Sequence, residues 1–227
     1  METITLTSRE QTAVNEFIYG VYNWMALGLA LTGVVAWLVA NTPALQQLIF
    51  GNQLVFYGLI IGELGLVFTL AARIEKIERK TAVMLYIAYA LLNGATLSSI
   101  FMIYARSTIT TTFFICAGTF IASSAYGMLT KKDLTSMGSF LFMGLIGIVI
   151  ASIVNMFVQS SQMSMIISYI GVIVFVGLTV YDTQRLKYLA YTQGASGKGA
   201  ILGALTLYLD FINLFLMLLR IVGGGRD

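Results

Sequence analysis

The stretch Gly203-Ala-Leu-Thr-Leu-Tyr-Leu-Asp-Phe-Ile-Asn-Leu-Phe-Leu-Met-Leu-Leu-Arg220 decides the fold, because it is almost wholly apolar and carries a single acidic residue, Asp210. A helix needs about 20 mostly apolar residues to cross the hydrocarbon core of a bilayer. Helices and closed barrels cross it because they satisfy their backbone hydrogen bonds internally. The stretch therefore predicts a transmembrane helix with a carboxyl group near its middle.

The rest of the chain has the same character. Of its 227 residues, 58% are hydrophobic and 10% are charged, whereas a soluble domain has about 25% charged residues. Seven stretches are apolar and long enough to span a membrane, and they predict an all-α integral membrane protein, a seven-transmembrane-helix bundle. The predicted spans are 19–40, 53–72, 82–104, 110–129, 137–158, 165–185 (or slightly beyond) and 200–222.

The loops between the spans are short, which predicts a single membrane domain over residues 19–222. A polar segment, 1–18, precedes it and a tail, 223–227, follows it. The only proline, Pro43, marks the end of the first span, because proline cannot continue a helical hydrogen-bond ladder. Glycines four residues apart, Gly58 with Gly62 and Gly199 with Gly203, are typical of closely packed helices in lipid.

Lysine and arginine accumulate on the cytoplasmic side of membrane proteins. With the N-terminus inside, ten of these residues fall on inner segments and three on outer ones. We therefore predict a cytoplasmic N-terminus and, after seven spans, a C-terminus outside. If helix seven were a re-entrant hairpin, the C-terminus would return to the cytoplasm.

The residue types exclude several classes of function. The chain has no histidine and a single cysteine, Cys116, which excludes internal disulfides, Cys/His zinc sites and histidine-based catalysis. The basic residues flank apolar spans and form no continuous stripe, so no nucleic acid is expected as a partner. We expect a protein that is not an enzyme and has no cofactor.

Three acidic residues fall within spans: Glu63, Asp182 and Asp210. Such a group costs several kcal/mol at the bilayer centre unless it faces the bundle interior and finds a partner. Asp210 lies near the midplane, and Thr206 and Asn213 share its helix face. All three acids are candidates for an ion pathway, and so is Asn213.

Asp182 allows two interpretations. It lies three residues before Arg185, so it can form an ordinary ion pair at the helix end. If helix six runs on past Lys187, Asp182 lies deeper and can meet Asp210 on the antiparallel neighbouring helix. Two carboxyl groups at one site cannot both ionise easily, so the pair titrates as a unit and senses protons. Arg73, at the cytoplasmic end of the second span, is either a positive-inside anchor or a gate that swings towards the carboxylate of helix six.

The string Leu207-Tyr-Leu-Asp-Phe-Ile-Asn-Leu-Phe215, with Tyr181-Asp-Thr-Gln184 upstream, resembles the Bax inhibitor-1 family of transmembrane Bax inhibitor motif proteins, in particular its bacterial YbhL- and YccA-like branch. The resemblance extends over the membrane region and includes Lys131-Lys132-Asp133-Leu134 and the glycines between 171 and 177.

This resemblance implies a bundle with helix seven surrounded by the other six, in the bacterial inner membrane, and a pH-sensitive calcium leak. It implies that Asp182 and Asp210 form the pH-sensing dyad and that Arg73 is the latch on Asp182 in the closed state. It also implies a membrane protease such as FtsH as a partner. Calcium usually takes six to eight oxygen ligands, so the two aspartates would bind it weakly and transiently, as permeation requires.

Two other functions stay open from the sequence. The sequence is compatible with a non-catalytic regulator that binds other membrane proteins such as FtsH. The two aspartates also resemble those of an intramembrane aspartyl protease, but Asp210 follows Tyr208-Leu209 instead of the Gly-x-Gly of presenilin-type enzymes.

Overall fold

The computed structural model describes residues 8–193 and 197–224. The described residues are almost entirely helical and contain no strand, which confirms the all-α prediction. Three segments lie outside the described residues: 1–7 in the predicted polar segment, 194–196 before the last span and 225–227 in the tail.

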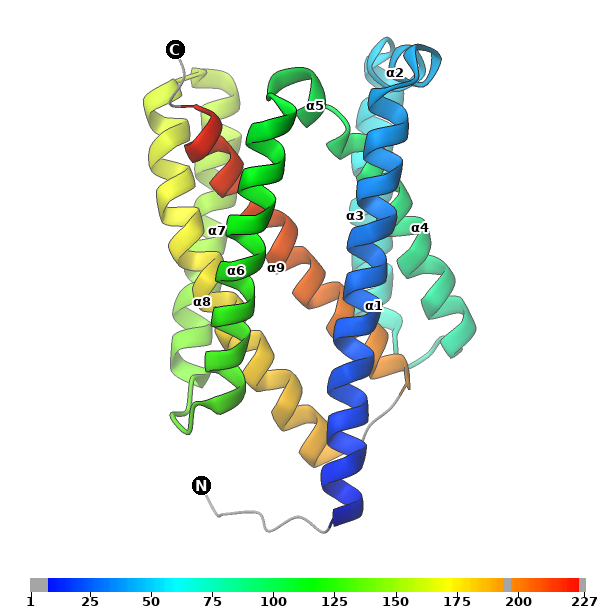
Figure 1. Ribbon diagram of the computed structural model, residues 1–227, viewed down its shortest axis with the longest axis vertical. Helices are drawn as coiled ribbons and strands as arrows, with labels where there is room; N and C mark the ends of the chain where they lie inside the picture. The colour runs from blue at the N-terminus through cyan, green and yellow to red at the C-terminus, as the bar shows by residue number, and fades with distance from the viewer. Residues whose placement is uncertain (1–7, 194–196, 225–227) are drawn as a thin grey trace. The chain divides into compact units, whose positions relative to one another are not determined.

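Among residues 8–193 and 197–224, seven helical segments are long and apolar enough to cross a membrane, as predicted. The helices, drawn in Figure 1, are α1 (Ser8–Ala40), α2 (Pro43–Phe50), α3 (Gln53–Arg73), α4 (Arg79–Leu97), α5 (Ile100–Ile103), α6 (Arg106–Leu129), α7 (Thr135–Val158), α8 (Ser161–Gln193) and α9 (Gly197–Gly223).

Two short helices were not predicted. Pro43 does not form a simple turn but starts α2, where its missing N–H costs nothing because the first turn of a helix has no acceptor for it. The predicted span 82–104 is interrupted after Leu97, and α5 follows. The hydroxyl of Ser98 donates to the carbonyl of Ala95 at 2.6 Å. Such local side-chain bonds compete with the helical ladder.

Internal contacts divide the chain into two compact units. Unit 1 comprises Met1–Ile103 with Lys187–Tyr208, and unit 2 comprises Tyr104–Leu186 with Leu209–Asp227. The long helices α8 and α9 therefore contribute to both units.

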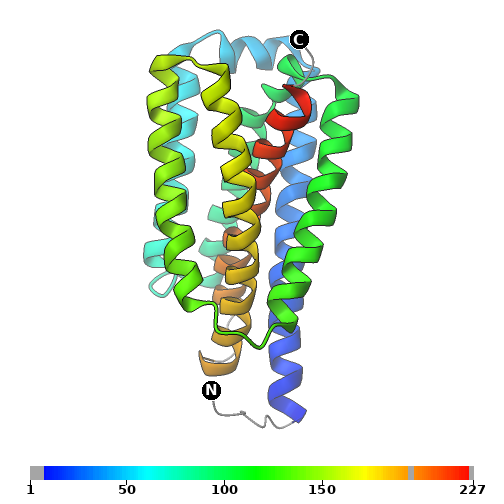
Figure 2. The same ribbon diagram turned by 90° about the vertical axis from the view of Figure 1, so that its left-hand side faces the viewer.

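In unit 1, α4 packs against α1 and α3, and α2 lies across the ends of α1 and α3 (Figure 2). The close approach of α1 and α4 depends on Gly94, where an added Cβ would meet the carbonyl oxygen of Thr32 at 2.7 Å. The predicted packing role of Gly58 is wrong, because an added Cβ there meets nothing within 4 Å. At Gly62 it would make only an ordinary contact with Leu92, at 3.8 Å.

In unit 2, α8 lies between α6 and α7 (Figure 2). An added Cβ at Gly127 of α6 would meet the carbonyl oxygen of Val180 at 2.5 Å, and one at Gly138 of α7 would overlap the ring of Tyr181. The turn from α7 to α8 passes through Gln159, which has the left-handed φ of 55° that commonly ends a helix.

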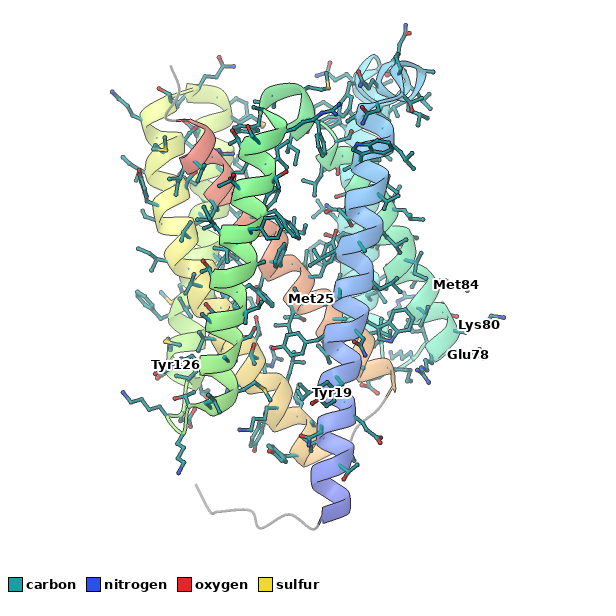
Figure 3. The ribbon with its side chains drawn as sticks, viewed as in Figure 1. Tyr19, Met25, Glu78, Lys80, Met84 and Tyr126 are labelled. Carbon is teal, nitrogen blue, oxygen red and sulfur yellow. The ribbon has the colours of Figure 1, made fainter. Side chains whose placement is uncertain are left out.

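Burial differs strongly among the spans. Of the residues in the most apolar window of each span, 61% are buried in α9 but only 6% in α3. Exposed apolar and aromatic side chains cover the spans, among them Tyr19 on α1 and Tyr126 on α6, both labelled in Figure 3. A surface of this kind fits a lipid solvent, in which apolar side chains need no cover.

Candidate functional site

Asp182 and Asp210 come together in unit 2. Asp182 projects from α8 and Asp210 from α9, and their carboxyl groups lie within hydrogen-bonding reach of each other. Both are buried, with 6% and 5% of their surfaces exposed. We call these two residues the dyad.

A hydrogen bond within the dyad requires a proton. An ionised carboxylate only accepts hydrogen bonds, so two carboxyl groups can bond to each other only when one of them is protonated. If that proton leaves, two like charges face each other in a buried site, which is costly unless a cation compensates them. The dyad can therefore exchange a proton for a cation.

The surroundings of Asp210 are largely apolar. Its neighbour Phe211 packs against Phe113 and Phe120 of α6, with ring centroids 5.7 and 5.5 Å apart. The carbonyl of Phe211 accepts a hydrogen bond from the Cys116 thiol at 3.6 Å. Within the described part of the chain, Asp210 Oδ2 is buried without a hydrogen-bond partner, so one oxygen of the dyad has no protein donor.

The depth of Asp182 decides between the two interpretations of this residue. The candidate membrane span of α8 runs from Ser161 to Tyr191, whereas the predicted span was 165–185 or slightly beyond. Asp182 lies inside this candidate span and is buried, and exposed Arg185 is near enough to interact with it electrostatically. Its neighbour Thr183 is also buried and donates to Ser124 Oγ of α6 at 3.4 Å.

Gln184 connects this part of α8 to the loop between α6 and α7. Its Nε2 donates to the carbonyl of Lys132 at 2.8 Å, and its Oε1 accepts from the amide of Leu134 at 3.1 Å. Because one side chain holds two backbone groups, it fixes the loop to the helix two residues after Asp182. The sequence singled out Gln184 only as part of a motif.

Glu63 lies in unit 1, half-buried on α3. It accepts hydrogen bonds from Asn93 Nδ2 at 3.0 Å and from the Thr96 hydroxyl at 2.8 Å, both on α4. Arg73 lies exposed in the last turn of α3, also in unit 1. Its predicted partner Asp182 belongs to unit 2, and the latch stays a prediction.

The polar neighbours predicted along α9 bond to their own helix. Asn213 donates to the carbonyl of Leu209 at 2.8 Å, and the Thr206 hydroxyl donates to that of Leu202 at 3.1 Å. The part of Asn213 in an ion pathway stays a prediction.

Sequence reasoning missed Asn93 and Thr96, the partners of Glu63. The signal was present, since Asn93 is an amide within an otherwise apolar span, and such groups find partners inside a bundle. Their spacing along the chain does not reveal which of them meet.

No cluster of three or more His, Cys, Asp or Glu side chains occurs among residues 8–193 and 197–224. The oxygens that the dyad offers to a cation are the carboxyl oxygens of two residues, Asp182 and Asp210.

Comparison with known proteins supports the resemblance. The sequence model of the family "Inhibitor of apoptosis-promoting Bax1" matches residues 14–227. The chain is 50% identical to the "Inner membrane protein YbhL" of Escherichia coli (strain K12) over 221 residues, which cover 95% of this chain and 94% of the relative. It is 44% identical to a protein of Borreliella burgdorferi, with 99% of both chains covered, and 43% identical to one of Rickettsia prowazekii, with 100% of this chain and 98% of the relative covered. This multi-pass membrane protein therefore belongs to the Bax inhibitor family.

Proposed function

We propose that the protein is a pH-sensitive calcium leak channel of the bacterial inner membrane, gated by the proton shared between Asp182 and Asp210. The observation that carries the proposal is the close approach of these two buried carboxyl groups, which lie on different helices long and apolar enough to span the membrane. A shared proton holds the dyad together, and its loss leaves negative charge that a passing cation can neutralise.

Calcium is proposed as the transported ion and not as a resident cofactor. Two carboxyl groups supply fewer oxygens than the six to eight that calcium usually takes. A site with so few ligands binds the ion weakly, which lets it leave and permits flow.

Arg73 and Glu63 complete the proposed pathway. In the closed state Arg73 would pair with Asp182, and deprotonation of the dyad would change the partner available to the guanidinium. The N-terminus would face the cytoplasm, as the distribution of basic residues predicts. Association with a membrane protease such as FtsH is a further prediction, made from the family resemblance.

The test measures calcium influx into proteoliposomes at a series of pH values. We expect influx in the wild type to rise as the pH rises through the titration of the dyad. Asp182→Asn and Asp210→Asn remove an ionisable partner and should each lose this pH dependence. Glu78→Gln is the matched control, since Glu78 is exposed at the start of α4 (Figure 3) and makes no side-chain cap there.

Equal influx in the wild type and both aspartate variants at every pH would rule out the dyad as the gate. Absence of influx in the wild type, in a preparation that is folded by circular dichroism, would rule out the leak itself.

A further inference from the structure

A continuous chain of side-chain hydrogen bonds connects four helices of unit 1. It begins at Glu63 of α3, which accepts from Asn93 Nδ2 of α4 at 3.0 Å. Asn93 Oδ1 accepts from the hydroxyl of Tyr208 on α9 at 2.9 Å. The same hydroxyl lies 2.6 Å from Oγ1 of Thr32 on α1. We call these four side chains the relay.

The inner members of the relay are shielded from solvent. Tyr208, Thr32 and Asn93 expose 0%, 4% and 8% of their surfaces. The Tyr208 ring packs edge-on against Tyr86 and Tyr89, with centroids 6.3 and 5.5 Å away. Buried polar groups are hydrogen-bonded as a rule, so each hydroxyl proton of the relay has to be assigned to an acceptor.

The hydroxyl protons of the relay are too few for its bonds. The Thr32 hydroxyl also donates to the carbonyl of Ala90 at 2.9 Å. The contacts Thr32–Ala90, Thr32–Tyr208 and Tyr208–Asn93 are therefore three, whereas the two hydroxyls have one proton each. Only two of the three bonds can exist at once if Asn93 keeps its orientation.

Two arrangements connect all four side chains of the relay. In the first, Thr32 donates to Tyr208 and Tyr208 donates to Asn93 Oδ1, which leaves the Asn93 amide group to donate to Glu63. In the second, the Asn93 side chain is turned over, so its amide group donates to Tyr208, Tyr208 donates to Thr32, and Thr32 donates to Ala90. The two differ in the direction of every bond between side chains.

The charge of Glu63 biases the choice between them. Ionised Glu63 only accepts, so it requires the amide group of Asn93 and favours the first arrangement. Protonated Glu63 gains a donor that can bond to the Asn93 carbonyl oxygen, which favours the second. Thr96 donates to Glu63 in both cases. Only Glu63 gains a proton from solvent, whereas the protons of Tyr208 and Thr32 change direction without leaving their oxygens.

The charged surroundings of Glu63 leave this choice to the relay. The titratable groups that interact with it electrostatically, among the described residues, are Tyr89 and Tyr208, which are neutral phenols. Helix α2, which packs against α3, carries no charged residue, and the charged residues of α4, Arg79 and Lys80, lie in its first turn, at the other end from Asn93. On α3 itself the basic residue is Arg73, exposed at the far end of the helix.

We propose that Glu63 is a second proton-sensing site, separate from the dyad, and that the hydrogen bonds of Asn93 and Tyr208 transmit its charge state to α9. Tyr208 precedes Asp210 by two residues in the same helix. The helix that carries one aspartate of the dyad therefore also carries the tyrosine that responds to Glu63. The inference rests on the proposed function only for its consequence in transport, because the switch itself can be observed without any transported ion.

The test is infrared difference spectroscopy of the purified protein in lipid, titrated with acid in the absence of calcium and with ring-labelled tyrosine. We expect a carboxyl C=O band that grows on acidification and disappears in Glu63→Gln. We also expect the C–O band of one tyrosine to shift with the same midpoint, because the Tyr208 hydroxyl exchanges acceptors. This shift should be lost in both Tyr208→Phe and Glu63→Gln.

Two further variants make the outcome specific. Thr32→Val removes the alternative acceptor, so the Glu63 band should remain while the tyrosine shift is lost. The double variant Asp182→Asn with Asp210→Asn should retain both signals, which separates the relay from the dyad even if no calcium flux is found. A tyrosine shift that persists in Glu63→Gln, or that has a midpoint unrelated to the Glu63 band in the wild type, would overturn the proposal.

Discussion

Asp133 shows how a single exposed side chain shapes this membrane protein. In the loop between α6 and α7, its Oδ1 accepts from the Thr135 amide at 2.9 Å and from the Thr135 hydroxyl at 2.7 Å. These bonds stabilise the ionised carboxylate, and they hold the pKa of Asp133 below its usual value, with the side-chain bond the larger cause. The carboxylate thereby fixes the chain that enters α7.

We predict that the stabilisation by Asp133 depends on pH. A carboxyl group with a depressed pKa in the folded state stabilises fully above its unfolded pKa, about 4, and loses the effect as the pH falls through its folded pKa. Asp133→Asn should therefore lower the thermal midpoint of the detergent-solubilised protein at neutral pH and have a smaller effect below pH about 4. A difference between the two proteins that is the same at neutral and acidic pH would contradict this account. Gln162→Glu, on the exposed first turn of α8, serves as a control for charge alone.

At the scale of elements, the contact between α6 and α8 depends on a missing side chain. Gly127 lets α6 approach the backbone of α8, because a Cβ there would lie 2.5 Å from the carbonyl oxygen of Val180 and 3.0 Å from Thr183 Cβ. Gly118, nine residues earlier on the same helix, has open space where its Cβ would be. The two glycines therefore form a matched pair.

Gly127→Ala should destabilise the protein by about 1–3 kcal/mol, since a methyl group forced into a filled contact shifts the backbone. Gly118→Ala should cause no loss, because its methyl group meets lipid or detergent. Thermal unfolding followed by size-exclusion chromatography measures both. If the two variants unfold at the same temperature, close packing at Gly127 is not what holds α6 to α8.

The same glycines show where sequence reasoning succeeds and where it stops. Hydropathy was enough to find all seven spans, because lipid imposes length and apolar composition on any helix that crosses it. It could not tell Gly58, which faces open space, from Gly94 and Gly127, which face other backbones. The difference depends on the rotation of each helix against its neighbour, and neighbours are not given by local composition.

At the scale of the whole molecule, the buried thiol offers a clean test of the predicted topology. Cys116 is fully buried, so the native chain should react little with a membrane-impermeant maleimide. Exposed Gln47 on α2 follows one span, whereas exposed Lys132 follows four, so the two lie on opposite sides of the membrane.

We predict that Gln47→Cys is labelled in intact cells whose outer membrane has been permeabilised and that Lys132→Cys is labelled in inverted inner-membrane vesicles. Labelling of both variants after detergent solubilisation is the control for reactivity. The reverse pattern would place the N-terminus outside and overturn the assignment made from basic residues.

The acids of the candidate site, like the spans, were predictable from the sequence, whereas most of their hydrogen-bond partners were not. The acids in the spans were visible in the sequence because charges in lipid are rare and costly. The candidate span of α8 extends to Tyr191, so it includes Asp182 together with Arg185 and Lys187, which had left the end of this span open. The relay was not predictable, because Thr32, Asn93 and Tyr208 are ordinary polar residues on helices far apart in the sequence.

The order of the helices also has a consequence for biosynthesis. Asp182, on α8, is synthesised before Asp210, on α9, so α8 enters the bilayer when its carboxyl partner does not yet exist. A ribosome stalled between the two helices would leave an unpaired carboxyl group in α8, near the end that borders the cytoplasm in the predicted topology. When α9 follows, its more central aspartate meets Asp182 on a helix that is already made. The chain thus inserts the last acid of its spans into a membrane that already holds the carboxyl partner.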